Sequence, residues 1–229
     1  MQTSVQQLKN FLTEKEDATI HPITIWIITF LCLIAYFLPW IHHQTTSLTL
    51  GAYDLAEWAG LHPLIRISDP PRLVSLYLRA IPVLLVALIS FNVPRPIFKS
   101  LGWWLSAGFI IATVLALLPP LEYFTNVNAR QDPNFQQHFQ LALASLSIGL
   151  IGLSGLLRRF RWFLNIIIAI MGIGIILTAL TDIIDAMEWT GLSVNVGIGA
   201  IFMFILFVLL ATYSIIRILR RTSLAYKIK

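Results

Sequence analysis

The sequence predicts an all-α membrane protein: a bundle of six transmembrane helices, with short interfacial helices in its extracytoplasmic loops. Three observations predict this fold. The 229 residues are 57% hydrophobic and only 12% charged. The apolar residues gather in six stretches, each close to the roughly 20 residues that a helix needs to cross a bilayer. The basic residues gather in segments that lie on one side of those stretches.

The six stretches define one membrane domain, residues 23–216, between two polar ends. The predicted spans are residues 23–40, 73–91, 101–118, 139–157, 162–181 and 196–216. We predict a polar cytoplasmic tail over residues 1–22 and a basic cytoplasmic tail over residues 217–229. A chain of this length and composition leaves no room for a soluble domain beside the bundle.

Basic residues set the predicted orientation. Of the 16 lysines and arginines, 12 fall in the two tails and in the second and fourth loops, and only Arg66, Arg72, Arg79 and Arg130 fall on the other side. Because short loops rich in Lys and Arg stay in the cytoplasm, both termini are predicted to be cytoplasmic. No Asn-x-Ser/Thr sequon occurs, and we expect an integral protein of a bacterial plasma (inner) membrane.

Charge and cysteine content exclude several classes of partner. The net charge of +5 comes from the basic cytoplasmic side, where such groups attract anionic lipid headgroups. The expected partners are therefore the lipid bilayer and other membrane subunits or a second copy of the chain, with no nucleic acid. Cys32 is the sole cysteine, which excludes an intramolecular disulfide and a cysteine-based metal site.

The loops differ in length and character. The first tail carries an apolar spacing over Ser4–Glu16 that fits either a helix lying on the membrane surface or a frayed tail. The first loop is the longest, and Ala52–Gly60 within it is predicted as a short helix. The fourth loop, Arg158–Arg161, is so short that the spans on either side are expected to be antiparallel neighbours.

An eight-residue pattern occurs twice, each time after an odd-numbered span. Asp54 to Leu61 and Asp185 to Leu192 both read Asp-x-x-Glu-Trp-x-Gly-Leu. We interpret each copy as a short interfacial helix, in which Trp58 or Trp189 is the anchor at headgroup level and the glycine ends the helix. The two copies fit either a true internal duplication or two unrelated segments with a similar sequence because both return the chain to the membrane.

Arg79 is the most unusual residue within a span, because a charged side chain there is costly unless it is paired. The acids of the repeated pattern are its expected partners: Asp54, Glu57, Asp185 and Glu188. Three roles remain open for Arg79 at this stage. It can form a structural ion pair, extend to the nearby interface, or bind an anionic substrate.

Small side chains concentrate in the fourth span, where they permit close helix approach in lipid. Ser145, Gly149, Gly152 and Gly155 form this predicted packing face, and Gly172 in the fifth span offers a matching surface. We expect the fourth and fifth spans to pack closely through these residues.

No motif carries a catalytic, cofactor or metal site. The Gly152-Leu153-Ser154-Gly155 segment is similar to the Gly-x-Ser-Gly of rhomboid intramembrane proteases, which also have six spans. The sixth span holds no histidine to act as general base, so we do not expect a protease. Histidines lie only at span ends and in loops, which argues against axial ligation of a buried haem, and the cofactor remains unknown.

The sequence therefore predicts a non-catalytic multi-pass membrane protein that serves as a structural or accessory subunit of a larger complex. The alternative is a small-solute transporter, or a substrate-capturing membrane subunit of one. In size and topology the chain is similar to the substrate-capturing subunits of energy-coupling vitamin transporters, although no sequence motif supports that resemblance.

Overall fold

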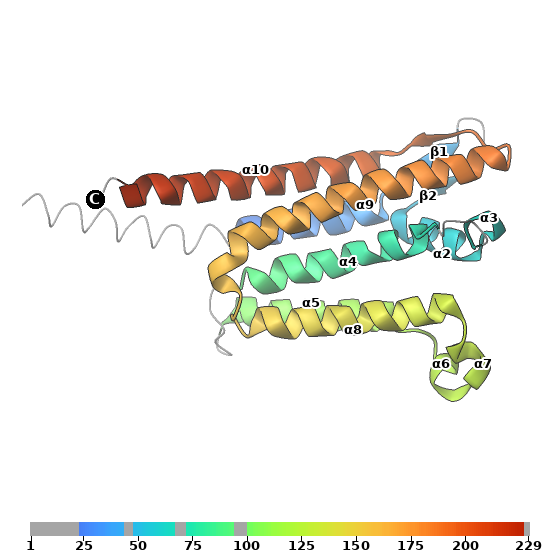
Figure 1. The fold of residues 1–229 in the computed structure, drawn as a ribbon, viewed down its shortest axis with the longest axis horizontal. Helices are drawn as coiled ribbons and strands as arrows, with labels where there is room; N and C mark the ends of the chain where they lie inside the picture. The colour runs from blue at the N-terminus through green and yellow to red at the C-terminus, as the bar shows by residue number, and fades with distance from the viewer. Residues whose placement is uncertain (1–22, 44–47, 67–71, 94–99, 227–229) are drawn as a thin grey trace, which may run out of the picture.

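A computed structural model of the chain describes residues 23–43, 48–66, 72–93 and 100–226. Six long helices run side by side along the molecule: Ile23–Phe37, α4 (Val74–Phe91), α5 (Leu101–Leu117), α8 (Pro133–Leu153), α9 (Arg161–Trp189) and α10 (Ile198–Tyr226) (Figure 1). Short helices connect them: α2 (Ala52–Leu61), α3 (Pro63–Arg66), α6 (Glu122–Thr125), α7 (Val127–Arg130) and the 3-10 turn η1 (Arg158–Phe160). The predicted tail 1–22, with its segment 4–16, lies outside the described residues.

The helical fold class is confirmed. Three helices are long and apolar enough to cross a membrane: Val74–Phe91, Arg158–Trp189 and Ile198–Arg220. Two further apolar helices, Ile23–Phe37 and Leu101–Leu117, are shorter, and 17 residues extend only about 25 Å. These helices are compatible with a membrane location.

Local sequence signals set several helix boundaries. Asp132 caps α8, because its Oδ1 accepts a 2.8 Å hydrogen bond from the Asn134 N–H and Pro133 stands at the first helical position. Ser100 caps α5 by accepting from the Trp103 N–H at 3.2 Å. After α9, Gly191 takes a positive φ of 78°, so the Leu192 N–H can reach the Met187 carbonyl at 3.0 Å.

Helix α4 is the centre of the bundle. Thirteen of its eighteen residues are buried, so it packs on both sides rather than along one stripe. The larger apolar core joins one side of α4 to α2, α9, α10 and the N-terminal helix. A smaller core of Val83, Leu117, Leu141 and Ala142 joins the other side to α5 and α8.

A small antiparallel sheet, which the sequence did not predict, ties two distant loops together. Its strand order is β2 (Thr49–Leu50), β1 (Ile41–His43) and β3 (Val194–Val196). The start of α10 lies very close to the segment between the first helix and β1, since a Cβ on Gly199 would stand 2.6 Å from the Leu38 carbonyl oxygen. The sheet therefore fixes α10 against the end of the first helix.

The predicted close packing of the fourth span against the fifth is wrong. Helix α8 packs on α4 and α5, and α4 lies between it and α9 (Figure 1). The small residues have other partners: a Cβ on Gly149 would meet Ile110 in α5, and one on Gly152 would meet Ser90 in α4. Gly172 in α9 faces Phe207 of α10. A four-residue loop constrains the ends of two helices but does not force contact along their length.

The prediction of two equivalent helices for the repeated pattern is also wrong. The first copy forms the separate helix α2, as predicted. The second copy is the last part of the continuous helix α9, which extends to Trp189. Gly191 ends that helix with a positive φ, whereas Gly60 stays within α2. The shared letters therefore encode different local structures.

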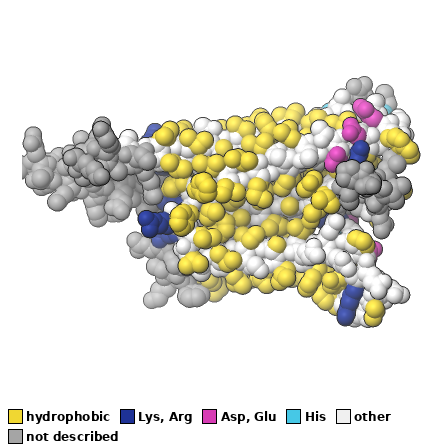
Figure 2. Space-filling view, viewed as in Figure 1, with side chains coloured by type: hydrophobic (Ala, Val, Ile, Leu, Met, Phe, Trp, Pro, Cys, Tyr) yellow, Lys and Arg dark blue, Asp and Glu magenta, His cyan; other side chains and the backbone are white. Residues whose placement is uncertain are grey.

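Acidic side chains gather at one end of the bundle, whereas basic side chains occur at both ends (Figure 2). We call the end that carries η1, with Arg158 and Arg159, the basic end. We call the opposite end, where α2, α3, α6, α7 and the sheet lie, the acidic end (Figure 1). The hydrophobic side chains cover the bundle between these ends (Figure 2).

Candidate functional site

Arg79 is the centre of a polar cluster at the acidic end. Its side chain is only 1% exposed, and burial of a guanidinium requires partners for its charge and its N–H groups. Nη2 donates to Glu57 Oε1 at 2.8 Å, and Nη1 donates to Asn134 Oδ1 at 2.5 Å. Of the roles that the sequence left open, the structure contains an ion pair between the buried Arg79 and the partly exposed Glu57.

Three helices contribute to this cluster. Glu57 lies on α2, Arg79 lies one turn and a half into α4, and Asn134 lies in the first turn of α8. Helix α8 adds His138, whose Nε2 lies 3.6 Å from Glu57 Oε1. That separation is longer than a hydrogen bond, so the two side chains are close polar neighbours without an ideal hydrogen bond between them. The cluster holds α2 and α8 against the end of α4.

The cluster keeps Glu57 ionised. The neighbouring His138 and the Arg79 guanidinium hold the pKa of Glu57 below its ordinary value, and partial burial of the carboxyl group opposes them. A carboxylate fixed in this way is a poor proton donor near neutral pH. The cluster thus links α2, α4 and α8 through one ion pair and one hydrogen bond.

Among the described residues, no three His, Cys, Asp or Glu side chains lie close enough together to share a metal ion. Glu57 and His138 are neighbours, but the third group beside them is the cationic Arg79. A guanidinium offers only donors and cannot bind a cation.

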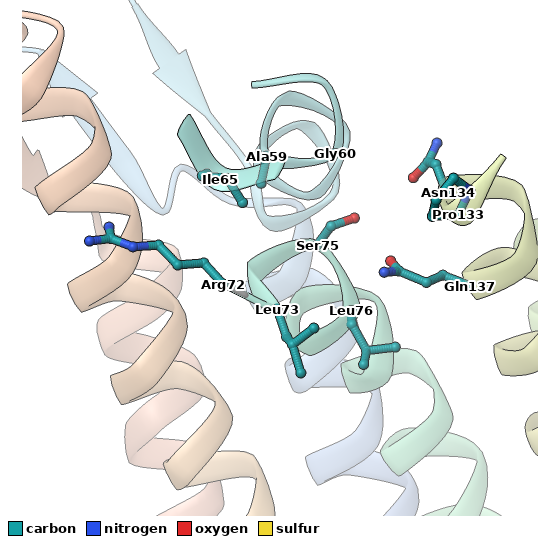
Figure 3. A pocket seen from close by; sticks show the side chains of 10 residues that line it. All are labelled: Ala59, Gly60, Ile65, Arg72, Leu73, Ser75, Leu76, Pro133, Asn134 and Gln137. Carbon is teal, nitrogen blue, oxygen red and sulfur yellow. The ribbon is translucent and has the colours of Figure 1, made fainter. Parts of the chain in front are cut away.

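A pocket of about 300 Å³ lies next to the cluster, between the end of α2, the start of α4 and the start of α8 (Figure 3). The residues that line it are Ala59, Gly60, Ile65, Arg72, Leu73, Ser75, Leu76, Pro133, Asn134 and Gln137. The Ser75 hydroxyl points toward Asn134 and Gln137, whereas Arg72 extends toward α9 (Figure 3). Arg72 donates there to the Asp182 carbonyl at 3.3 Å.

The other acids of the repeated pattern do not join Arg79. Asp54 Oδ2 accepts from the Gly51 N–H at 3.2 Å and so caps α2. Asp185 and Glu188 lie exposed on α9. The two tryptophans also differ, because Trp58 is half-buried and its ring lies 4.4 Å from that of His62, while Trp189 is 72% exposed.

The predicted small residues take part in helix packing to different extents. Ser145, Gly149, Gly152 and Gly172 are buried between helices. Gly155 lies beyond the end of α8 with a φ of 74°, so its role is to turn the chain toward η1.

Sequence reasoning missed Asn134, Gln137 and His138. Their spacing of i, i+3 and i+4 places them on one helix face, and the buried residues Leu141 and Ser145 continue that face. A polar triplet in line with a buried stripe was the available signal. The predicted fourth span begins at residue 139, so it leaves all three residues in the loop before it.

A second missed feature lies near the basic end. Asn92 and Asn165 are buried and exchange side-chain hydrogen bonds of 2.8 Å and 3.3 Å. Asn92 Nδ2 also donates to the Leu88 carbonyl at 2.7 Å. This pair joins the end of α4 to α9.

Comparison of the chain with protein families, with curated proteins and with solved structures finds no match.

Proposed function

We propose that this chain is a non-catalytic, six-span integral membrane protein that acts as an accessory subunit of a larger membrane complex. The observation that carries the proposal is the exposed face of α9. Toward the acidic end one line of this face changes from bulky apolar side chains to small and polar ones, beside the exposed Leu177 and in a region that the neighbouring helices leave uncovered.

The face has a defined composition. Phe163, Ile167 and Ile170 form its half toward the basic end, and all three are exposed. Gly174, Thr178 and Thr181 follow at helical spacing and are also exposed, and a Cβ on Gly174 would meet nothing within 4 Å. We call Gly174, Thr178 and Thr181 the α9 small face.

The α9 small face suits contact with another helix. The hydroxyls of Thr178 and Thr181 already donate to the carbonyls of Gly174 and Leu177 on their own helix, so lipid exposure does not leave them without partners. Small residues let two helix backbones approach closely, which favours association in lipid. Asp185 and Glu188 continue the same line toward the acidic end, so the partner helix is expected to carry a basic side chain there.

Six spans and cytoplasmic termini are part of the proposal. The separation of basic from acidic side chains supports this orientation, because basic loops favour the cytoplasm. The helices Ile23–Phe37, α5 and α8 run beside the three longer apolar helices (Figure 1), which supports six crossings. A bacterial inner membrane is the proposed location.

Site-specific photo-crosslinking tests the subunit role. A photoreactive phenylalanine analogue at Thr178, irradiated in native membranes, should give one discrete crosslinked product. The matched control is the same analogue at Gly108 in α5, which is also exposed with nothing within 4 Å of its would-be Cβ. Gly174→Leu should abolish the product at residue 178, because a large side chain separates the helices.

Equal crosslinking to lipid alone from both positions would refute the subunit role. A product containing two copies of this chain would identify self-association instead of a different subunit.

Transport or capture of a small solute is the second candidate. The pocket at the acidic end favours it, since buried polar atoms line that pocket. The subunit role is preferred because no Asp, Glu, His, Lys or Arg side chain lies midway along α5, α8, α9 or α10 among the described residues, and proton-coupled transport usually needs one.

A further inference from the structure

We propose that the pocket between α2, α4 and α8 binds a small neutral polyol, either as a free molecule or as the glycerol headgroup of a lipid. This proposal goes beyond the subunit role and does not depend on it.

Two of the residues that line this pocket carry buried polar atoms without a partner. Ser75 is only 6% exposed, and its Oγ has no hydrogen-bond partner. The buried Oε1 of Gln137 also lacks a partner. Buried polar atoms in proteins are almost always hydrogen-bonded, so these two atoms on facing helices indicate an occupant that bonds to both (Figure 3).

The contact with Arg79 identifies which amide atom of Asn134 is the oxygen. Since a guanidinium only donates hydrogen bonds, the amide atom that faces Arg79 is the oxygen. A Cβ on Gly60 would lie 3.0 Å from that oxygen and 3.5 Å from Ser75 Oγ. The oxygens of Asn134 and Ser75 therefore lie next to the Gly60 position, where the absence of a side chain leaves space, and the Gln137 side chain extends toward them from α8 (Figure 3).

This set of atoms selects for hydroxyl groups. Two amide oxygens accept hydrogen bonds, and the serine hydroxyl both donates and accepts. An anion would face two acceptors, which disfavours it. A cation bound to Asn134 would lie close to the Arg79 guanidinium, which disfavours it through like charge. A ligand with several hydroxyls satisfies all three oxygens without a net charge.

Pocket size and walls agree with a small polyol. A volume of about 300 Å³ is at the lower end of ligand pockets. Ala59, Ile65, Leu73, Leu76 and Pro133 supply apolar walls for the carbon backbone of the ligand.

Saturation-transfer difference NMR on the full chain tests the proposal, with glycerol, erythritol and sorbitol as probes. The detergent must lack a sugar or glycerol headgroup, because such a headgroup would compete. We expect saturation transfer to at least one probe. Ser75→Ala and Gln137→Leu should each weaken its binding about fivefold, the size expected for one net hydrogen bond. Gly60→Ala should weaken it too, by placing a methyl group between the polar oxygens.

The control variant is Ser145→Ala, because Ser145 Oγ is also buried without a partner but does not line the pocket. It should bind the probe like the parent. Native mass spectrometry from nanodiscs then distinguishes the two sources. Retention of phosphatidylglycerol over phosphatidylethanolamine, lost in Gln137→Leu, identifies the lipid headgroup.

If neither saturation transfer to a polyol nor retention of phosphatidylglycerol is observed, the proposal is wrong and the pocket holds only water. Equal effects of Ser75→Ala and Ser145→Ala would also overturn it. Neither result bears on crosslinking at Thr178, so this proposal and the subunit role fail separately.

Discussion

At the scale of single residues, Arg79 shows how a charge is accommodated inside this bundle. Its guanidinium is buried, yet it reaches Glu57, which is 36% exposed. The pair thus lies between an exposed ion pair, worth under about 1 kcal/mol, and a buried one, whose disruption costs about 3–5 kcal/mol. Asn134 shares the charge through a second hydrogen bond. We therefore expect an intermediate contribution to stability.

Glu57→Gln should lower the free energy of unfolding by about 1–3 kcal/mol at neutral pH, because Arg79 loses its counter-ion. The pKa of Glu57 is lower in the folded protein than its ordinary value of 4.5. Ionised Glu57 therefore stabilises the fold fully above that value, and the contribution is lost as pH falls through the folded pKa. Thermal unfolding in detergent from pH 3 to 8 measures both effects.

The matched control for this prediction is Glu188→Gln, since Glu188 lies exposed on α9. It should unfold like the parent across the same pH range. If the two variants lose stability equally, the contact between Glu57 and Arg79 contributes no more than a surface charge.

At the scale of elements, helix neighbours are determined by the fit of small residues against specific side chains. Gly152 and Gly174 have the same residue type and both lie in long helices, but their surroundings are opposite. A Cβ on Gly152 would lie 2.2 Å from Ser90 Oγ and 2.8 Å from the Ser90 carbonyl carbon, whereas one on Gly174 would meet nothing within 4 Å. Only the first glycine permits a close approach between helices.

Gly152→Ala should therefore destabilise the bundle by about 1–3 kcal/mol, because the methyl group must separate α8 from the backbone of α4. Gly174→Ala should be neutral or slightly stabilising, since alanine is the better helix former. Chemical or thermal unfolding of the two purified variants compares them directly. Similar loss in both would mean that α8 does not lie on α4 at Ser90.

The sequence predicted helix positions better than helix neighbours. Apolar stretches locate α4 and α5 to within a residue or two, because each helix must present apolar residues along its whole length. Neighbours depend on three-dimensional fit, which spacing alone does not contain. Phe207 shows this: a phenylalanine in an apolar stretch can face lipid or a neighbouring helix, and the fold buries this one fully against Gly172.

The site was partly predictable for a similar reason. A lone arginine in a span requires a partner, and the sequence restricted the acids to four. Choosing Glu57 required knowing that α2 folds over the end of α4 as a separate helix, while the second copy of the pattern continues α9. Two local sequences that share five of eight residues took different structures because their tertiary surroundings differ.

At the scale of the whole molecule, the two ends of the bundle differ in both charge and structure. The basic end has short connections such as η1. The acidic end holds the sheet, four short helices, the Arg79 cluster and the pocket. Binding surfaces tend to be built on longer connections held by a rigid scaffold. The side of the membrane that the acidic end faces therefore determines where any ligand of the pocket would be found.

Cysteine labelling in intact cells determines that side. In a Cys32→Ala background, a membrane-impermeant maleimide added outside should label Asn128→Cys in α7 and Glu188→Cys in α9, both exposed at the acidic end. It should leave Arg159→Cys in η1 unlabelled until the cells are opened, because the basic end is expected to face the cytoplasm. Cys32 is fully buried, so its conversion to alanine removes background without exposing a surface.

Labelling of Arg159→Cys from outside would reverse the orientation. Labelling of Asn128→Cys and Glu188→Cys from opposite sides would show that α8 and α9 do not both cross, and the six-span topology would then be abandoned.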